Sequence, residues 1–183
     1  MKNILMFFIT LVLAACSSTE IKEEISHSEN RSTEFGVELG RYISLTEGKR
    51  MLISDILDYC TKSFPERAEE IQMVKEGWDD RNRKYLGHWQ ELAVDWLKSE
   101  GASETDISSD IESLNVIIPL ALNEARKNSE KITTTIEAKN QDDKMRACGF
   151  FTGLVKGGSQ DISTSKEALN LHSKYSVATQ KKQ

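Results

Sequence analysis

Residues 65–100 read PERAEEIQMVKEGWDDRNRKYLGHWQELAVDWLKSE and carry the clearest helical pattern in the chain. Mostly apolar side chains recur there at alternating steps of three and four, as on one face of an amphipathic helix. The members of this seam are Ala68, Ile71, Lys75, Trp78, Asn82, Tyr85, Trp89, Leu92 and Trp96. Pro65 suits the first position of a helix, and Gly101 suits a helix end. The segment is therefore predicted to form one long helix from Pro65 to about Glu100.

A second helical stripe ends where this one begins. Its members are Phe35, Leu39, Ile43, Ile53, Leu57, Cys60 and Phe64. Glycines weaken its first part, so the strongest helix is expected from near Thr46. Phe35-Val37-Leu39 also alternates like a strand, but no partner strand is visible in the sequence. Because proline disfavours helical geometry in the preceding residue, this helix should end at Phe64-Pro65.

Two further main helices are predicted after residue 101. Ser103 should cap the first, with Asp106 at the capping-box position, and Pro119 should kink this helix without ending it. Its apolar stripe is Ile107, Ile111, Leu114, Ile118, Leu122, Ala125, Ile132 and Ile136. A turn is expected at 139–142, followed by a helix that carries Met145, Cys148, Phe151, Leu154 and Val155 and stops at Gly157-Gly158. Ser163 or Thr164 should then cap a short helix that frays at 180–183.

These elements predict an all-α fold, an antiparallel bundle of four main helices over residues 33–162, with a short helix and frayed tail over 163–183. The second and third helices are nearly equal in length, so the turns at Phe64 and Asn140 should lie at the same end. Cys60 and Cys148 both lie close to these turns. A structural disulfide between them is therefore favoured, and would stabilise the fold by roughly 4 kcal/mol in the chain-entropy model. Two buried thiols or a redox-active pair are the alternatives, without a CxxC spacing to support them.

The first 15 residues have the properties of an export signal. Lys2 gives a positive start, and the apolar run after it is shorter than the roughly 20 residues that a membrane-spanning helix needs. The segment closes on Leu13-Ala14-Ala15-Cys16, which resembles the lipobox of bacterial lipoproteins. That resemblance implies a diacylglycerol thioether on Cys16, cleavage before it and acylation of the new amino group. The alternative is an ordinary signal peptide with a cysteine near its cleavage site.

The lipobox also implies a location. Several acyl chains on one residue hold a protein stably to a membrane, so membrane lipid, through acylated Cys16, is the first expected partner. In Gram-negative members of the family an aspartate after the cysteine tends to retain the protein at the inner membrane. Ser17 therefore implies the outer membrane, with the periplasmic face favoured over the cell surface. Residues 16–32 are polar and charged, and they are predicted to form a flexible tether with a reach of roughly 20 Å.

Charge limits the other partners. Removal of residues 1–15 takes away Lys2 and no acid, which lowers the 24 basic residues to 23 against 29 acidic ones and leaves a net charge of −6. An acidic surface disfavours nucleic acid and anionic lipid headgroups as partners. No nucleic acid is therefore expected as a partner, and the location that the lipobox implies makes an envelope protein the candidate macromolecular partner.

Trp78, Arg81 and Asn82 form a Trp-x-x-Arg-Asn motif that resembles one in small, exported, helical bacterial proteins of unknown function. Cys60-Thr61-Lys62-Ser63-Phe64-Pro65, Cys148 and Gly158-Ser159-Gln160-Asp161 fit the same pattern, which implies a fold and no activity. Asn82 lies on the apolar seam, where a polar side chain can fix the register of a helix. A structural role, with Arg81 and Asn82 bonding to another helix or to loop carbonyls, is favoured over a ligand contact.

The aromatic stripe of Trp78, Tyr85, Trp89 and Trp96 has two interpretations. Aromatic residues at helical spacing usually belong to a core, but these four could instead line a pocket for an apolar or ring-shaped ligand. Packing of Phe35, Ile118 and Leu154 against the stripe would favour a core, and a cavity there would favour a pocket.

Catalytic, metal and cofactor sites are not indicated. The three histidines are scattered, with His27 in the tether, His88 on the long helix and His172 in the tail, and no HExxH or CxxCH occurs. Asp79-Asp80 is better explained as part of a solvated face than as an acid–base pair. No GxSxG elbow or phosphate-binding glycine loop is present.

The sequence therefore predicts a non-enzymatic, membrane-anchored envelope lipoprotein that acts by binding or scaffolding. Its role would be in envelope assembly, or as an inhibitor or immunity protein against a wall-attacking enzyme. A carrier that uses the aromatic stripe to hold an apolar ligand is the alternative, and a hydrolase has the least support.

Overall fold

The computed structural model describes the backbone of residues 30–180 and the side chains of residues 35–176 except Ile117. The predicted signal peptide, Cys16 and most of the tether lie outside the described residues. The packed unit begins at Phe35. Every regular element of the described residues is a helix, so the predicted all-α class is confirmed.

The first predicted helix is present in three consecutive pieces. These are α2 (Asn30–Ile43), a π-helical turn (Ser44–Gly48) and α3 (Lys49–Ser63). Phe35 and Leu39 are buried and Val37 is 38% exposed, as positions i, i+4 and i+2 of a helix require, so the strand-like alternation does not form a strand. Gly48 lets α6 (Glu104–Glu137) come close, because a Cβ at this position would stand only 3.3 Å from Ala125 Cβ.

The single long helix predicted for residues 65–100 is wrong. The chain instead forms a 3₁₀ turn (Pro65–Arg67), α4 (Ala68–Asn82), a second 3₁₀ turn (Arg83–Tyr85) and α5 (Trp89–Ser99). The backbone is extended at Leu86, with ψ at 143°, and Gly87 has a φ of +77°. Only glycine adopts that φ readily, and the Gly87 N–H donates to Glu47 Oε1 at 2.6 Å. Helical periodicity did not reveal this break, because each of the two helices buries its own apolar face.

The third predicted helix is confirmed. α6 begins at the predicted capping box: Ser103 Oγ accepts from the Asp106 N–H at 3.2 Å, and Asp106 Oδ2 accepts from the Ser103 N–H at 3.3 Å. Two N–H groups that the first helical turn leaves unpaired are thereby satisfied. α6 continues without interruption through Pro119.

The fourth predicted helix is also confirmed, as α7 (Gln141–Lys156). Asn140 caps it by accepting a hydrogen bond from the Asp143 N–H at 2.9 Å. A 3₁₀ turn (Ile162–Thr164) follows and leads into α8 (Lys166–Gln180).

α8 differs from the short terminal helix that the sequence predicts. Its cap is Ser165, whose Oγ accepts from the Ala168 N–H at 3.2 Å, so neither Ser163 nor Thr164 has this role. The side chains of Ala168 and Tyr175 are fully buried. The packed bundle therefore extends past residue 162, because α8 buries an apolar face that its own short sequence pattern shows weakly.

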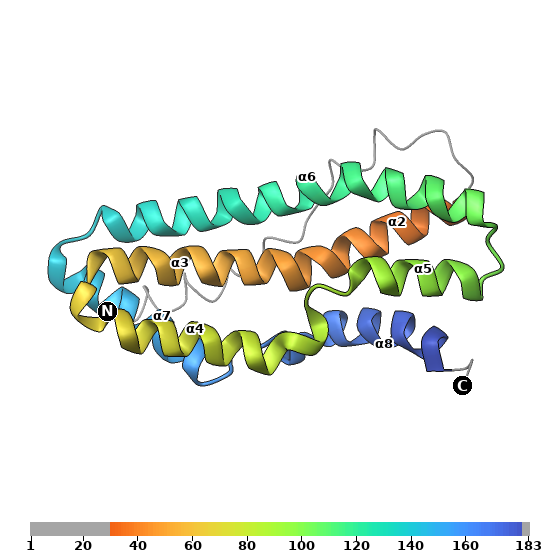
Figure 1. The fold of residues 1–183 in the computed structure, drawn as a ribbon. Helices are drawn as coiled ribbons and strands as arrows, with labels where there is room; N and C mark the ends of the chain where they lie inside the picture. Colours follow the sequence, from red (N-terminus) through yellow and green to blue (C-terminus); the bar gives the residue numbers. More distant parts are fainter. Residues whose placement is uncertain (1–29, 181–183) are drawn as a thin grey trace. The chain divides into compact units, whose positions relative to one another are not determined.

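Consecutive groups of helices alternate in direction (Figure 1). α2 and α3 run one way, α4 and α5 return, α6 runs parallel to α3, and α7 and α8 return. α3 contacts α4, α6 and α7, while α5 contacts α6 and α8. The predicted helical bundle is confirmed, although its first two helices are divided and α8 is added.

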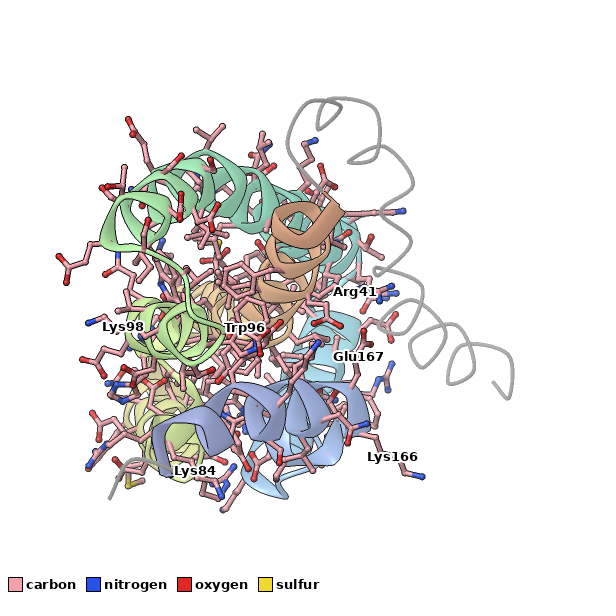
Figure 2. All side chains as sticks on the ribbon, turned by 90° about the vertical axis from the view of Figure 1, so that its right-hand side faces the viewer. Arg41, Lys84, Trp96, Lys98, Lys166 and Glu167 are labelled. Atoms are coloured by element: carbon pink, nitrogen blue, oxygen red, sulfur yellow. A yellow bond between two sulfur atoms is a disulfide. The ribbon has the colours of Figure 1, made fainter. Side chains whose placement is uncertain are left out.

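The described side chains form two apolar cores. The disulfide core comprises Ile53, Ile56, Leu57, Cys60, Phe64, Ile71, Val74, Trp78, Tyr85, Leu86, Ile136, Cys148, Val155, Ile162 and Ala168. The aromatic core comprises Phe35, Leu39, Tyr42, Ile43, Leu92, Ala93, Leu97, Ile107, Leu114, Ile118, Leu171 and Tyr175, with Trp89 and Trp96 packed against it. Seen along the helices, Trp96 lies toward the middle of the bundle, whereas Lys98 and Lys166 lie at its periphery (Figure 2).

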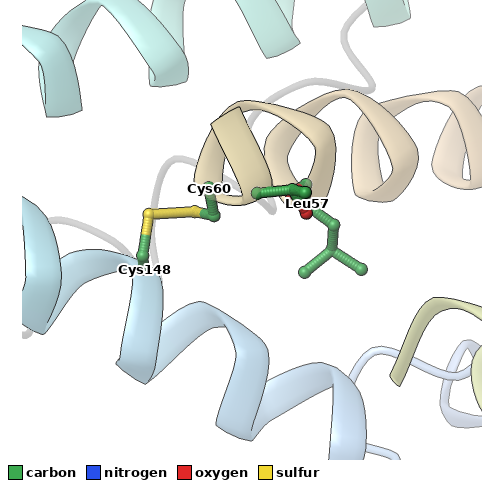
Figure 3. The surroundings of a disulfide bond; sticks show 4 residues. Leu57, Cys60 and Cys148 are labelled. Atoms are coloured by element: carbon green, nitrogen blue, oxygen red, sulfur yellow. A yellow bond between two sulfur atoms is a disulfide. The ribbon is translucent and has the colours of Figure 1, made fainter. Parts of the chain in front are cut away.

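The predicted disulfide is confirmed. Cys60 of α3 and Cys148 of α7 are bridged across 88 residues of sequence, with their Cα atoms 5.6 Å apart (Figure 3). Both cysteines are fully buried, and Leu57 lies one turn earlier on α3 in the same core. The predicted layout is correct on this point, because the turns that follow α3 and α6 lie at the same end of the bundle.

Candidate functional site

The Trp-x-x-Arg-Asn motif lies at the end of α4 and faces residues 157–162, which connect α7 to α8. Trp78 is 1% exposed and Asn82 is fully buried. Trp78 Nε1 donates to the Gln160 carbonyl at 2.9 Å. The motif thus contacts a segment about 80 residues away in the sequence.

Asn82 uses both ends of its amide group in this contact. Its Oδ1 accepts from the Ile162 N–H at 2.7 Å. Its Nδ2 donates to the Trp78 carbonyl at 2.8 Å and to Asp161 Oδ1 at 3.3 Å. A buried amide with its donors and its acceptor paired to the chain has little capacity left for a ligand.

Arg81 binds the same connection through a two-pronged contact. Its Nε donates to Asp161 Oδ2 at 2.9 Å, and its Nη2 donates to Asp161 Oδ1 at 3.1 Å. Nη2 also donates to the Val155 carbonyl at 2.7 Å, near the end of α7. Charge-assisted bidentate contacts of this kind fix geometry as well as contribute energy.

Lys49 approaches Asp161 from α3. Its Nζ donates to the Asp161 carbonyl at 3.3 Å. Burial lowers the pKa of the Lys49 ammonium, and the nearby Asp161 carboxylate partly offsets that effect. We refer to Lys49, Trp78, Arg81, Asn82 and Asp161 as the clamp, because together they tie the α7–α8 connection to α3 and α4.

The polar groups of the clamp bind other parts of the chain, which is the arrangement that a structural role of the motif requires. Two members of the clamp were not predicted as site residues. No sequence pattern selected Lys49, and Asp161 was named only within Gly158-Ser159-Gln160-Asp161, as part of the family resemblance. The signal for Asp161 was Gly158, which has a φ of +76° and whose Cβ, if present, would stand 3.1 Å from Asp161 Oδ2. Glycine adopts such a φ without strain, so Gly158 permits the turn that leads to Asp161.

The structure divides the aromatic stripe between the two cores. Trp78 and Tyr85 belong to the disulfide core, whereas Trp89 and Trp96 pack against the aromatic core. Phe35 stacks on Trp96 with ring centroids 4.2 Å apart. The four rings therefore do not line a common wall.

A second polar cluster connects α2, the α4–α5 break and α8. The Tyr42 hydroxyl donates to the Tyr85 carbonyl at 3.1 Å, and it lies 3.0 Å from His172 Nδ1. Because the hydroxyl has one proton, neutral His172 carries its own proton on Nδ1 and donates it to Tyr42. His172 was expected in a loose tail, but its ring lies edge-on to that of Tyr85 with centroids 4.9 Å apart.

Burial shifts the ionisation of both titratable groups in this cluster. It raises the pKa of the Tyr42 hydroxyl, with smaller contributions from Glu47 and Tyr85. It also lowers the pKa of the His172 imidazole, and Lys84 and His88 act in the same direction. Both shifts favour the neutral forms of the Tyr42 hydroxyl and the His172 imidazole.

A groove of about 440 Å³ lies beside Trp78. We call it the α3 groove. It is lined by Glu47, Arg50, Met51, Ile53, Ser54, Asp55, Lys75, Trp78, Asp79 and Leu122. Trp78 is the one member of the aromatic stripe among these residues, and most of the others are polar or charged. The groove is thus distinct from the apolar pocket that a carrier would need.

The chain matches no protein-family model, no curated protein and no solved structure. Within residues 30–180, no helix is long and apolar enough to cross a membrane. The same part of the chain contains no group of histidine, cysteine, aspartate or glutamate side chains arranged to hold a metal ion. Cys16, the predicted lipidation site, lies outside the described residues.

Proposed function

We propose that this chain is a membrane-anchored envelope lipoprotein, attached through acylated Cys16, that acts by binding or scaffolding and not by catalysis. One observation carries the proposal: a fully buried disulfide closes across 88 residues, in a chain whose first 16 residues resemble a leader that ends in a lipobox. Disulfides of this kind persist in oxidising compartments such as the periplasm, which is where the lipobox would direct the domain.

The other features agree with this role. The predicted tether, whose residues 30–32 belong instead to α2, would hold the bundle away from the bilayer, and Ser17 favours the outer membrane. The clamp uses its polar groups to stabilise the fold, so its residues have a structural use that does not require a substrate. The function would then lie in a surface that contacts another envelope protein, in envelope assembly or in inhibition of a wall-attacking enzyme.

The carrier alternative has less support. It needs the aromatic stripe to face a common cavity, and the rings of Trp96 and Phe35 are instead stacked on each other. Stacking of one ring on another in this way is typical of a hydrophobic core.

Metabolic labelling with palmitate tests the proposal. The wild type should take up label and fractionate with the outer membrane, and Cys16→Ala should take up none. Ser17→Asp is the matched control for location: it should keep the label but shift the protein toward the inner membrane. Equal labelling of the wild type and Cys16→Ala would end the proposal.

A further inference from the structure

We infer that the α3 groove is the docking site for a basic helical segment of a partner protein, with an arginine or lysine side chain seated on Asp55. The inference rests on the proposed binding function. It adds the place on the bundle where a partner binds and the chemistry of the segment that binds there.

The lining of the groove comes from α3, α4 and α6, with Glu47 from the turn before α3. α3 lies between α6 and α4 (Figure 1), and within Lys49–Ser63 only Arg50 and Lys62 are exposed. Two ion pairs join α3 to α4 here: Arg50 Nε lies 3.2 Å from Asp79 Oδ1 within the lining, and Lys75 Nζ of the lining lies 2.8 Å from Asp58 Oδ1, which is outside it. Positions 47 and 55, which both line the groove, are about 12 Å apart along a helix, which a helical segment of two to three turns covers. Laying a helix into a groove formed by other helices is a common mode of peptide recognition.

The charges of the groove favour a cationic guest. Arg50 and Lys75 are already paired with carboxylates of the chain. Asp55 differs, because no ion pair involves it among the described residues. Its Oδ2 accepts a hydrogen bond from Ser129 Oγ at 2.6 Å, and Ser129 is 1% exposed. A buried hydroxyl thus orients a half-buried carboxylate whose Oδ1 is left for an incoming donor.

The remaining lining suits the rest of such a side chain. Met51 and Leu122 are half-buried at the groove, and Ile53 and Trp78 are buried beneath it. Lysine and arginine place apolar methylene groups along such surfaces while the charged end reaches a polar partner. An anionic lipid or a nucleic acid would instead meet the Asp55 carboxylate, which disfavours both as occupants.

A synthetic peptide provides the probe. It is an acetylated, amidated helix of about 15 residues with leucines on one face and arginines beside them. Its binding is measured by fluorescence anisotropy with the full mature chain. A peptide with glutamate at every arginine position serves as the ligand control. Asp55→Asn is the test variant. Asp142→Asn is the matched control, because Asp142 is exposed at the start of α7 and this substitution removes the same charge.

We expect saturable binding of the arginine peptide to the wild type and none of the glutamate peptide. Asp55→Asn should weaken binding about tenfold, and Asp142→Asn should leave it within about twofold. Amide chemical shifts should move at Met51, Asp55 and Leu122 on titration. Equal weakening by both variants would show diffuse attraction to an acidic protein and overturn the inference, as would the absence of saturable binding.

Failure of this inference is distinguishable from failure of the proposed function. If Cys16 takes up palmitate and the arginine peptide does not bind, the lipoprotein proposal stands and the groove inference falls. If Cys16 takes up no label, the envelope role falls whatever the peptide does.

Discussion

The disulfide core has a covalent cross-link, which the aromatic core lacks, although hydroxyl groups at the edge of the aromatic core also make hydrogen bonds. In the disulfide core, a covalent bond and the buried Asn82 amide join segments 88 and 80 residues apart. In the aromatic core, the rings of Phe35, Trp96 and Tyr175 contact one another with centroids 4.2–5.9 Å apart. A covalent cross-link together with buried polar contacts specifies a single arrangement more strictly than apolar packing with polar contacts at its edge. The disulfide core should therefore be the last part of the bundle to open.

The largest expected effect comes from Trp78, which belongs to the disulfide core. Trp78→Ala should lower the free energy of unfolding by roughly 3–5 kcal/mol, because it removes a fully buried ring and leaves the Gln160 carbonyl without its donor. Trp96→Ala is the corresponding variant in the aromatic core. It should cost less, because Trp96 is only partly buried. Urea unfolding of the two variants measures the difference, and a larger loss for Trp96→Ala would reverse the comparison.

The next effect concerns the disulfide. Replacement of Cys60 and Cys148 together by serine should lower the free energy of unfolding by roughly 4 kcal/mol, mainly because the unfolded chain regains freedom over the closed loop. Urea unfolding of the oxidised wild type and the double variant tests this. Thiol alkylation of the denatured, unreduced, mature protein is the control, and it should find neither cysteine reactive. A loss below about 1 kcal/mol would mean that the clamp holds this core by itself.

A smaller loss is expected for Asn82→Ala. The Ile162 N–H would lose its acceptor inside the core, which should cost about 1–3 kcal/mol. Asn123→Ala is the matched control, because Asn123 is exposed on α6 and its replacement should leave the melting temperature unchanged or slightly higher. If Asn82→Ala melts with the wild type and a partner's binding is lost, the motif is a binding site and not part of a clamp.

The smallest effect is the pH dependence at the junction of the aromatic core with the α4–α5 break. Burial, with Lys84 and His88, holds the pKa of His172 below its usual value of about 6.5. Below that pH the unfolded chain binds a proton that folded His172 resists, so folding stability should fall as the pH drops. The free energy of unfolding should therefore decrease more between pH 7.5 and 5.5 in the wild type than in His172→Gln. Parallel pH profiles would show that His172 is solvated in the folded protein.

Local signals in the sequence predicted the features that depend on neighbouring residues. The capping box at Ser103, the turn at 139–142 and the helix end before Pro65 each follow from a few adjacent side chains. The disulfide was also predictable, because helix lengths place Cys60 and Cys148 at the same end of the bundle. These features need no knowledge of how the rest of the chain packs.

Features that depend on distant partners were not predictable in the same way. The break at Gly87 needs Glu47 as a hydrogen-bond acceptor, and α8 needs Tyr42 as the partner of His172. Periodicity reports which face of a helix is buried, but not where the backbone bends between two helices. The α3 groove was not predicted for a related reason. Asp55 lies on the polar side of its helix, and the hydrophobic pattern assigns that side to solvent.

Native-state hydrogen exchange of the oxidised protein tests most directly the claim that the disulfide core opens last. It measures the local stability of the disulfide core and of the aromatic core within one molecule. Amides of Leu57, Val74 and Cys148 should exchange only through global unfolding. Amides of Ala93, Leu97 and Leu171 should exchange faster, through partial openings of α5 and α8. Exchange of the second group at a rate equal to or slower than the first would contradict the account.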